Sequence, residues 1–291
     1  MLLSKSLPAN KKSKSLSKIG PIVQDVVPRS IADGSDKKCS YTCSCCPTIS
    51  NWCVRDAFGI ICCFVTWSLF LYGQFVVVII IYMSKTYTLL NFINLFSMHF
   101  LAFLALSSYC RTMFSNPGAI PLNNATSEKL HKVCQRCIKR MDHHCIFVNN
   151  CVGQNNQKYF ILFTFYTCVV AIYALIFLYF HLTTCITSNW TACPAWSPPV
   201  TLFFTIILAL EAFCFSIFTA IMTGIQFVCI YTDTTGVEFF RGRSKSNLKR
   251  NSFLSSLKIV FGAQIGLTWL NPYSKPTGFI TQNDEHISFD T

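Results

Sequence analysis

Four long apolar stretches, separated by polar segments, dominate the chain. They cover residues 57–83, 89–110, 159–183 and 201–231. Each exceeds the roughly 20 apolar residues that a helix needs to cross a bilayer. Glu211 is the only formally charged side chain in all four. The pattern therefore predicts an all-α polytopic membrane protein with four transmembrane helices.

The polar segments divide the chain around these helices. The N-terminal part is rich in Lys, Ser and Pro, which is typical of disorder, and the turn signal Asn116-Pro117-Gly118 follows the second helix. A more apolar stretch, residues 253–270, is expected to form an amphipathic helix that lies on the bilayer or packs against the central loop. The expected divisions are a largely disordered N-terminal tail (1–56), helices 1 and 2 (57–110), a central loop (111–158), helices 3 and 4 (159–231) and a C-terminal tail (232–291).

Composition and charge add an orientation. The 291-residue chain is 52% hydrophobic and only 12% charged, against about 25% in soluble domains. Of its 24 Lys and Arg residues, 23 fall in the two tails and the central loop, which the positive-inside rule assigns to the cytosol. The net charge of +12 then reflects topology and attraction to anionic lipid. Nucleic-acid binding would require a basic soluble domain, and the sequence offers none.

Two polar features belong to the membrane part and its margins. Glu211 is expected roughly 15 Å deep in the fourth helix, where a hydrogen bond to another helix, with His99 as the candidate partner, is favoured over catalysis. Cys185 and Cys193 lie in the loop expected to face the lumen, where they could pair. Without an internal repeat or interrupted helices, a channel or transporter gains little support.

A cysteine cluster ends the N-terminal tail close to the first helix. Because the cytosol is reducing, cysteines there are expected to be ligands, nucleophiles or lipidated thiols rather than disulfides. Palmitoylation is favoured for this cluster, with a zinc knuckle as the alternative. Its members are Cys39, Cys43, Cys45 and Cys46.

The central loop concentrates the candidate chemistry. The run Asp142-His143-His144-Cys145 puts a carboxylate, two imidazoles and a thiol on consecutive residues. An imidazole can take the proton of a thiol, and an acid can fix the tautomer of that imidazole. Beside a membrane, this pattern favours acyl-transfer chemistry.

The same loop indicates a metal site. A structural zinc needs four thiol or imidazole ligands, commonly including a Cys-x2-Cys pair. Spacing alone does not decide which side chains bind metal and which react. The candidates are Cys134, Cys137, His143, His144, Cys145 and Cys151, with His131 as a seventh.

These residues resemble a known family. The segment from Cys134 to Cys145 reads Cys-Gln-Arg-Cys-Ile-Lys-Arg-Met-Asp-His-His-Cys, and Val148-Asn-Asn-Cys-Val-Gly153 follows it. It closely resembles the DHHC protein S-acyltransferases, and the pattern looks most like the Golgi-type members. That family has four transmembrane helices with a cytosolic, zinc-binding cysteine-rich loop between helices 2 and 3. The likeness extends to Asn156, Trp190-Thr-Ala-Cys193, Ser197-Pro-Pro199, Thr235-Gly-Val-Glu238 and Val260-Phe-Gly262.

The resemblance implies a role for each residue of the motif. Cys145 matches the nucleophile, which takes a fatty acyl group from palmitoyl-CoA and passes it to a protein thiol. His143 matches the general base, Asp142 the acid that orients it, and His144 a zinc ligand. Neighbouring basic residues could attract the CoA phosphates, with ordinary positive-inside residues as an equal alternative. They are Arg136, Lys139 and Arg140.

Location and partners also follow from the resemblance. It implies a multi-pass protein of the Golgi or another endomembrane, with both termini cytosolic. Membrane lipid, acyl-CoA and proteins with a cysteine close to the membrane are the implied partners. Homo-oligomers, or hetero-oligomers with related acyltransferases, are a further expectation.

The chain departs from the family pattern in its metal ligands. The family loop has two zinc sites, but this chain has no Cys-x2-Cys pair between Gly118 and His131. One site keeps only Cys137, so we expect one zinc per chain. Two functions stay open: an S-acyltransferase, or an impaired pseudoenzyme or truncated isoform that partners an intact family member in the membrane. The implied ligands of the remaining zinc are His131, Cys134, His144 and Cys151, with His in place of the first Cys.

Overall fold

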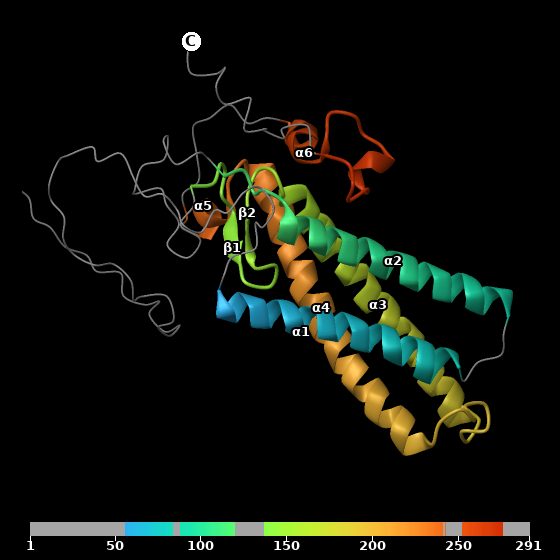
Figure 1. The fold of residues 1–291 in the computed structure, drawn as a ribbon. Helices are drawn as coiled ribbons and strands as arrows, with labels where there is room; N and C mark the ends of the chain where they lie inside the picture. The colour runs from blue at the N-terminus through green and yellow to red at the C-terminus, as the bar shows by residue number, and fades with distance from the viewer. Residues whose placement is uncertain (1–55, 84–87, 120–136, 241, 243–251, 276–291) are drawn as a thin grey trace, which may run out of the picture. The chain divides into compact units, whose positions relative to one another are not determined.

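The computed structural model describes residues 56–83, 88–119, 137–240, 242 and 252–275 (Figure 1). Several expectations fall outside these ranges. They concern the N-terminal tail with its cysteine cluster, and the site residues His131, Cys134 and Arg136.

Four helices in the described part are long and apolar enough to cross a membrane, which confirms the predicted fold class. The first begins as α1 (Ala57–Phe75) and continues as the π-helical η1 (Val76–Tyr82). The others are α2 (Leu89–Phe114), α3 (Gln157–Thr187) and α4 (Pro198–Thr232). Large apolar side chains such as Phe64, Leu71 and Phe96 are exposed on their outer faces, as a lipid-facing surface requires.

The helix ends show the local signals that start and stop helices. Asp56 caps α1 by accepting a hydrogen bond from the backbone N–H of Gly59 at 2.9 Å. Pro198 and Pro199 open α4, where their fixed φ suits the first turn. Asp233 ends α4 in a left-handed conformation with φ of 50°.

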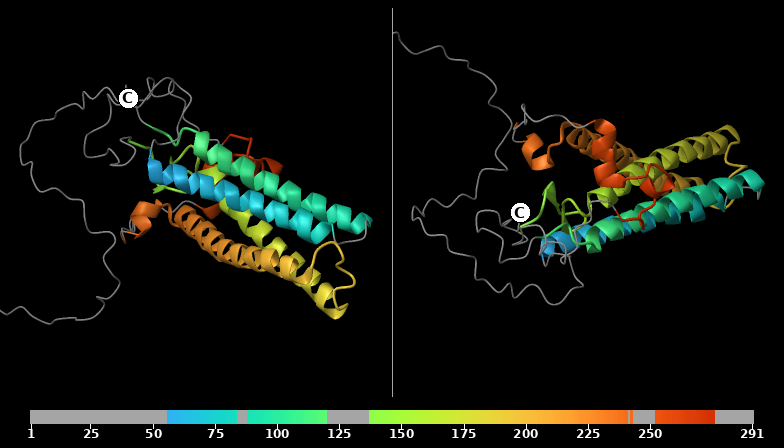
Figure 2. Two further views of the ribbon diagram at one scale, coloured as in Figure 1. Left: turned by 60° about the horizontal axis from the view of Figure 1, so that its bottom comes forward. Right: turned by 90° about the horizontal axis from the view of Figure 1, so that it is seen from above.

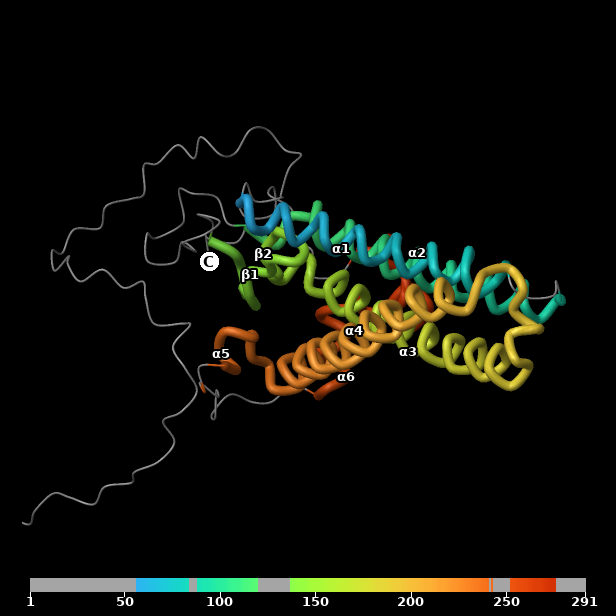
Figure 3. The backbone as a smooth tube through the Cα atoms, turned by 90° about the horizontal axis from the view of Figure 1, so that it is seen from below, coloured from blue at the N-terminus to red at the C-terminus, as the bar shows by residue number. Residues whose placement is uncertain are grey.

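Helix α3 forms the centre of the bundle. In its most apolar 18-residue window 61% of the residues are buried, compared with 17% to 28% in the other three helices. It packs against both α2 and α4; Figure 1 shows it running between them, and in Figure 3 it crosses α4 at an angle. The segment that directly precedes the N-terminal end of α3 is the hairpin of the central loop.

A short β-hairpin lies at this end of the bundle, away from the loop that joins α3 to α4 (Figures 1 and 2). Strand β1 (His143–Cys145) pairs with β2 (Asn150–Val152) in antiparallel register, with His144 opposite Cys151. The predicted turn at Asn116 is confirmed, because its Oδ1 accepts hydrogen bonds from the backbone N–H groups of Gly118 and Ala119 at 2.9 and 2.8 Å.

Two asparagines fix the hairpin to the helix ends. The Nδ2 of Asn150 donates to the backbone carbonyls of Thr112, Met113 and Ser115 at 3.0–3.1 Å. These groups include the last carbonyls of α2, which have no partner within the helix. Asn156 Nδ2 donates to the carbonyl of Cys151 at 2.8 Å and to that of Thr112 at 3.3 Å. These side chains thus hold the hairpin against backbone groups at the end of α2.

The C-terminal part packs on the helices. It contains α5 (Gly236–Phe240), α6 (Phe253–Phe261) and the 3-10 helix η4 (Leu267–Trp269). Helix α6 contacts α3 and α4 (Figure 2), and its residues Ser256, Ile259 and Val260 line a pocket together with Arg140 and Gln154 of the central loop, as one of the two predicted positions requires. The ammonium group of Lys158, a residue with 0% exposure, donates to Thr268 O at 2.8 Å and to Ser274 O at 3.2 Å.

The predicted pairing of Cys185 with Cys193 is confirmed by a disulfide. It ties the last turns of α3 to the loop before α4. His181 lies one turn earlier and contacts the Cys185 sulfur, so these three residues cluster. Because both sulfurs are bonded to each other, the cluster offers no thiolate to a metal in this state.

Candidate active site

The strand register separates the residues of the central motif by face. Successive side chains of a strand point to opposite sides, so His143 and Cys145 share one face of β1 and His144 points to the other. Sequence spacing could not separate the reactive side chains from the metal ligands, but the alternation along this three-residue strand does so. One face can carry reactive groups while the other holds a structural ligand.

On the first face, a carboxylate and an imidazole are paired. Oδ2 of Asp142 lies 2.7 Å from Nδ1 of His143. Asp142 is 2% exposed, and the His143 ring packs edge-on against Phe160 with ring centroids 5.0 Å apart. This geometry leaves Nε2 as the ring nitrogen that can accept a proton.

Groups from other elements hold the Asp142 carboxylate in place. The backbone N–H of Gly236 in α5 donates to Oδ1 at 2.5 Å, and Nε2 of Gln226 in α4 donates to Oδ2 at 2.7 Å. A Cβ at position 236 would lie 2.9 Å from Oδ1, so this close approach requires glycine. The Asp142 backbone is fixed as well, through N–H to Val152 O at 2.9 Å and Val237 N–H to Asp142 O at 3.1 Å.

These contacts set the charges of the pair. Burial disfavours the charged carboxylate, but the hydrogen bonds from His143, Gln226 and Gly236 outweigh it and hold the pKa of Asp142 below its usual range. For His143, burial disfavours the imidazolium, yet its interactions with Asp142 and Cys145 outweigh burial and raise its pKa. The arrangement therefore favours an imidazole that can take and keep a proton.

The Cys145 thiol lies close to the His143 ring. Nε2 of His143 is buried and makes no regular hydrogen bond within the described residues, while the Cys145 thiol is near enough to affect the His143 pKa. Cys145 is 7% exposed. Both residues line an apolar cavity of about 660 Å³, whose other walls include Phe147, Phe163, Phe215, Phe218 and Met222.

On the opposite face of the hairpin, two of the four implied zinc ligands meet. Nδ1 of His144 lies 3.4 Å from Sγ of Cys151. Two ligands of one tetrahedral zinc, at about 2.3 Å for sulfur and about 2.0 Å for nitrogen, lie roughly 3.5 Å apart. The described pair therefore fits a zinc ion in both chemistry and spacing. Cys137, seven residues before His144 in the sequence, is also buried.

The basic residues named from the sequence are at the surface. Lys139 and Arg140 are both exposed. The guanidinium of Arg140 forms an ion pair with Asp233 at 2.7 Å, with both side chains more than a third exposed. A phosphate at Arg140 would therefore compete with Asp233, whereas Lys139 forms no ion pair with another described residue.

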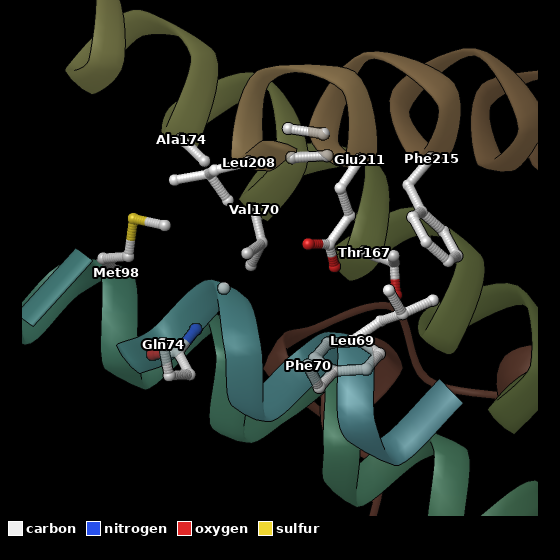
Figure 4. A pocket seen from close by; sticks show the side chains of 13 residues that line it. Leu69, Phe70, Gln74, Met98, Thr167, Val170, Ala174, Leu208, Glu211 and Phe215 are labelled. Atoms are coloured by element: carbon white, nitrogen blue, oxygen red, sulfur yellow. The ribbon is translucent and has the colours of Figure 1, made fainter. Parts of the chain in front are cut away.

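Glu211 lines a second cavity, deeper in the bundle, with an empty volume of about 480 Å³. Figure 4 shows its side chain reaching from α4 toward the cavity, with Thr167 and Gln74 on other helices around it. Each of the three has a buried oxygen without a partner among the described residues. The predicted Glu211–His99 hydrogen bond is not formed among the described residues, where Oε2 of Glu211 has no partner.

Comparison with known proteins places this geometry in a family. A family model described as DHHC palmitoyltransferase matches residues 122–243. Palmitoyltransferase ZDHHC3 of Rattus norvegicus is 39% identical over 257 residues, which cover 79% of this chain and 86% of the rat protein. The chain belongs to the DHHC palmitoyltransferase family. The resemblance inferred from the motif is thereby confirmed.

Other relatives support the assignment to the DHHC family over different lengths. Palmitoyltransferase ZDHHC7 of Rattus norvegicus is 36% identical over 249 residues, covering 76% of this chain and 80% of that protein. Probable protein S-acyltransferase 12 of Arabidopsis thaliana is 34% identical over 107 residues, covering 25% of this chain and 37% of that protein. The long matches therefore extend well beyond the motif.

Sequence reasoning missed several residues of this DHHC site. Gln226 and the Gly236 N–H contact Asp142 from far along the chain, and Asn150 anchors the hairpin to α2. One signal was present for Gln226, since it is a polar residue near the end of an apolar helix. Nothing in the local pattern identifies its partner.

Proposed function

We propose that this DHHC palmitoyltransferase moves a palmitoyl group from palmitoyl-CoA to protein cysteines through a thioester at Cys145. The observation that carries the proposal is the Asp142–His143 pair beside Cys145 at the mouth of an apolar cavity. Asp142 orients the ring through Nδ1, and Nε2 of His143 takes the proton of the thiol.

The reaction proceeds in two balanced exchanges. The Cys145 thiolate attacks the thioester carbonyl of palmitoyl-CoA, the bond to the CoA sulfur breaks, and the proton held by His143 neutralises the departing thiolate. The thiol of a protein substrate then gives its proton to His143 and attacks the new thioester. The Cys145 sulfur leaves and regains a proton. Each exchange replaces one thioester by another, so the enzyme supplies positioning rather than driving force.

The apolar cavity next to Cys145 supports an alkyl chain as the transferred group. Aromatic and thioether side chains line it, and burial of a hydrocarbon chain among them is favourable. Phe147 contacts Phe218 across the cavity with ring centroids 5.6 Å apart. The polar CoA part would then lie outside, near Lys139 and Arg140, and, by the resemblance, Arg136.

Topology and location follow the distribution of charge. Both termini and the loop 111–158 face the cytosol in this proposal, because nearly all Lys and Arg residues lie there. Substrates are proteins whose cysteine lies close to the cytosolic membrane surface. The Golgi is the proposed compartment, on the resemblance to Golgi-type members.

A single structural zinc is part of the proposal, held by His131, Cys134, His144 and Cys151. It would supply folding energy to the loop rather than chemistry. Elemental analysis of the purified full chain is expected to give one zinc per chain. His144→Ala should lower this value, while His99→Ala, which removes a histidine from a membrane helix, should not. Two zinc ions per chain would contradict the ligand assignment.

The intact geometry of Asp142, His143 and Cys145 supports an active enzyme over an impaired membrane partner. The test is acyl-enzyme formation by the purified chain with alkyne-labelled palmitoyl-CoA. We expect one label per chain, removable by neutral hydroxylamine and located on the Cys145 peptide by mass spectrometry, followed by transfer to a cysteine peptide. Absence of any hydroxylamine-sensitive label at saturating donor would support the impaired partner instead.

A further inference from the structure

The pairing of Asp142 with His143 is not what a regular strand provides. Neighbouring side chains of a strand point to opposite faces, and Asp142 directly precedes β1. Its carboxylate nevertheless turns back to within 2.7 Å of the His143 ring. Contacts from outside the hairpin must therefore hold the carboxylate in that conformation.

Gln226 provides the side-chain contact. It is 1% exposed and lies in α4, and its Nε2 donates to the same carboxylate oxygen that pairs with His143, at 2.7 Å. A carboxylate only accepts hydrogen bonds, so the amide must present its NH2 side to Asp142. The Asp142 oxygen is then held between two donors.

The orientation of the Gln226 amide is itself fixed. Its Oε1 accepts a hydrogen bond from Nε2 of Gln157, the first residue of α3, at 3.1 Å. With the amide reversed, two NH2 groups would face each other and a carbonyl oxygen would face a carboxylate. The chain of contacts Gln157–Gln226–Asp142–His143 thus joins two membrane helices to the reactive hairpin.

We infer that Gln226 is a positioning residue for acyl-enzyme formation, acting on Cys145 through Asp142 and His143. The inference rests on the proposed roles of those three residues. Gln226 lines neither the cavity beside Cys145 nor the deeper one, so its expected effect is on the reacting groups rather than on binding of the acyl chain. Its removal should slow the chemical step and leave donor binding unchanged.

The test compares Gln226→Leu, similar in size but without polar atoms, with the unaltered full-length chain. We expect acyl-enzyme formation to slow on the order of 10- to 100-fold, the usual effect of losing an outer hydrogen-bond partner. The KM for palmitoyl-CoA should change by less than about twofold, since uniform binding is untouched. Gln226→Glu, which puts an acceptor against the Asp142 carboxylate, should lose at least as much.

Two comparisons separate positioning from a general weakening of the helix packing. Thr223→Val removes a buried hydrogen bond between α4 and Thr164 of α3, 2.8 Å long, one turn from Gln226. It should lower Tm while keeping the rate within about threefold. In an Asp142→Asn background, Gln226→Leu should add less than about a threefold loss, because both act through one group.

Alkylation of the Cys145 peptide by iodoacetamide gives a readout that needs no acyl donor, and Gln226→Leu should slow it. If the unaltered chain forms no acyl-enzyme but its Cys145 is alkylated faster than in Gln226→Leu, the proposed function fails and the positioning role stands. If Gln226→Leu is alkylated as fast as the unaltered chain and also forms the acyl-enzyme as fast, the positioning role is overturned. A loss confined to KM, or one that persists in full with Asp142→Asn, overturns it as well.

Discussion

Replacing Cys145 with serine is expected to abolish acyl transfer, with a fall of at least about 1000-fold in acyl-enzyme formation. Serine keeps the size of the side chain, so the hairpin should fold unchanged. Its hydroxyl is a far weaker nucleophile than a thiol, which is partly ionised near neutral pH. Loss of both the hydroxylamine-sensitive label and peptide acylation, measured with alkyne-labelled palmitoyl-CoA, is the expected result.

A second cysteine provides the matched control for this change. Cys168 lies in α3, where its thiol contacts the backbone carbonyl of Ser216 at 3.6 Å, and it lines neither cavity. Cys168→Ser should acylate at a rate within about threefold of the unaltered chain. A labelled thioester that persists in the Cys145→Ser chain would place the acyl-enzyme on a different cysteine and refute the assignment.

Changing Asp142 to asparagine is expected to slow acyl-enzyme formation by about 100- to 10,000-fold while the protein remains folded. Three donors converge on this carboxylate, from His143, Gln226 and Gly236. An amide has a single acceptor atom and two N–H groups of its own, so one donor must be left facing another. The His143 ring then loses the partner that fixes its tautomer.

Single-turnover rates and thermal unfolding together measure this effect. Asp56→Asn makes the same chemical change at the N-cap of α1, where Asn and Asp are equally good caps. That control should leave both the rate and Tm close to those of the unaltered chain. If Asp142→Asn retained more than a tenth of the rate, or if its loss could be explained by unfolding alone, the orienting role of Asp142 would be refuted.

The membrane helices could be predicted because a bilayer-spanning helix is recognised from one continuous segment of sequence, without knowledge of its neighbours. Length and apolarity of a segment suffice to identify a spanning helix, and each of the four has more than enough of both. In the motif, the roles came only from the family resemblance, because no strand was predicted there. The structure adds that β1 places His143 and Cys145 on one face and His144 on the other.

Contacts between distant segments could not be predicted in this way. Gln226 lies 84 residues after Asp142, and Gly236 lies 94 residues after it, so only the packing of α4 beside the hairpin brings them together. Glu211 shows the same limit. Its depth in the helix could be predicted from the sequence, but the residues that line its cavity could not. The face of a helix that meets a given neighbour depends on the whole bundle.

Lys158 shows what the docking of the C-terminal segment means for a chain that is synthesised from one end. Lys158 ends the central loop expected from the sequence, and its ammonium is buried and bonded only to oxygens of Thr268 and Ser274 among the described residues. Until those residues have been synthesised, the ammonium must stay hydrated, because burying it without these acceptors would cost several kcal/mol. The packing around Lys158 is therefore complete only after residues more than a hundred positions later in the chain have been added.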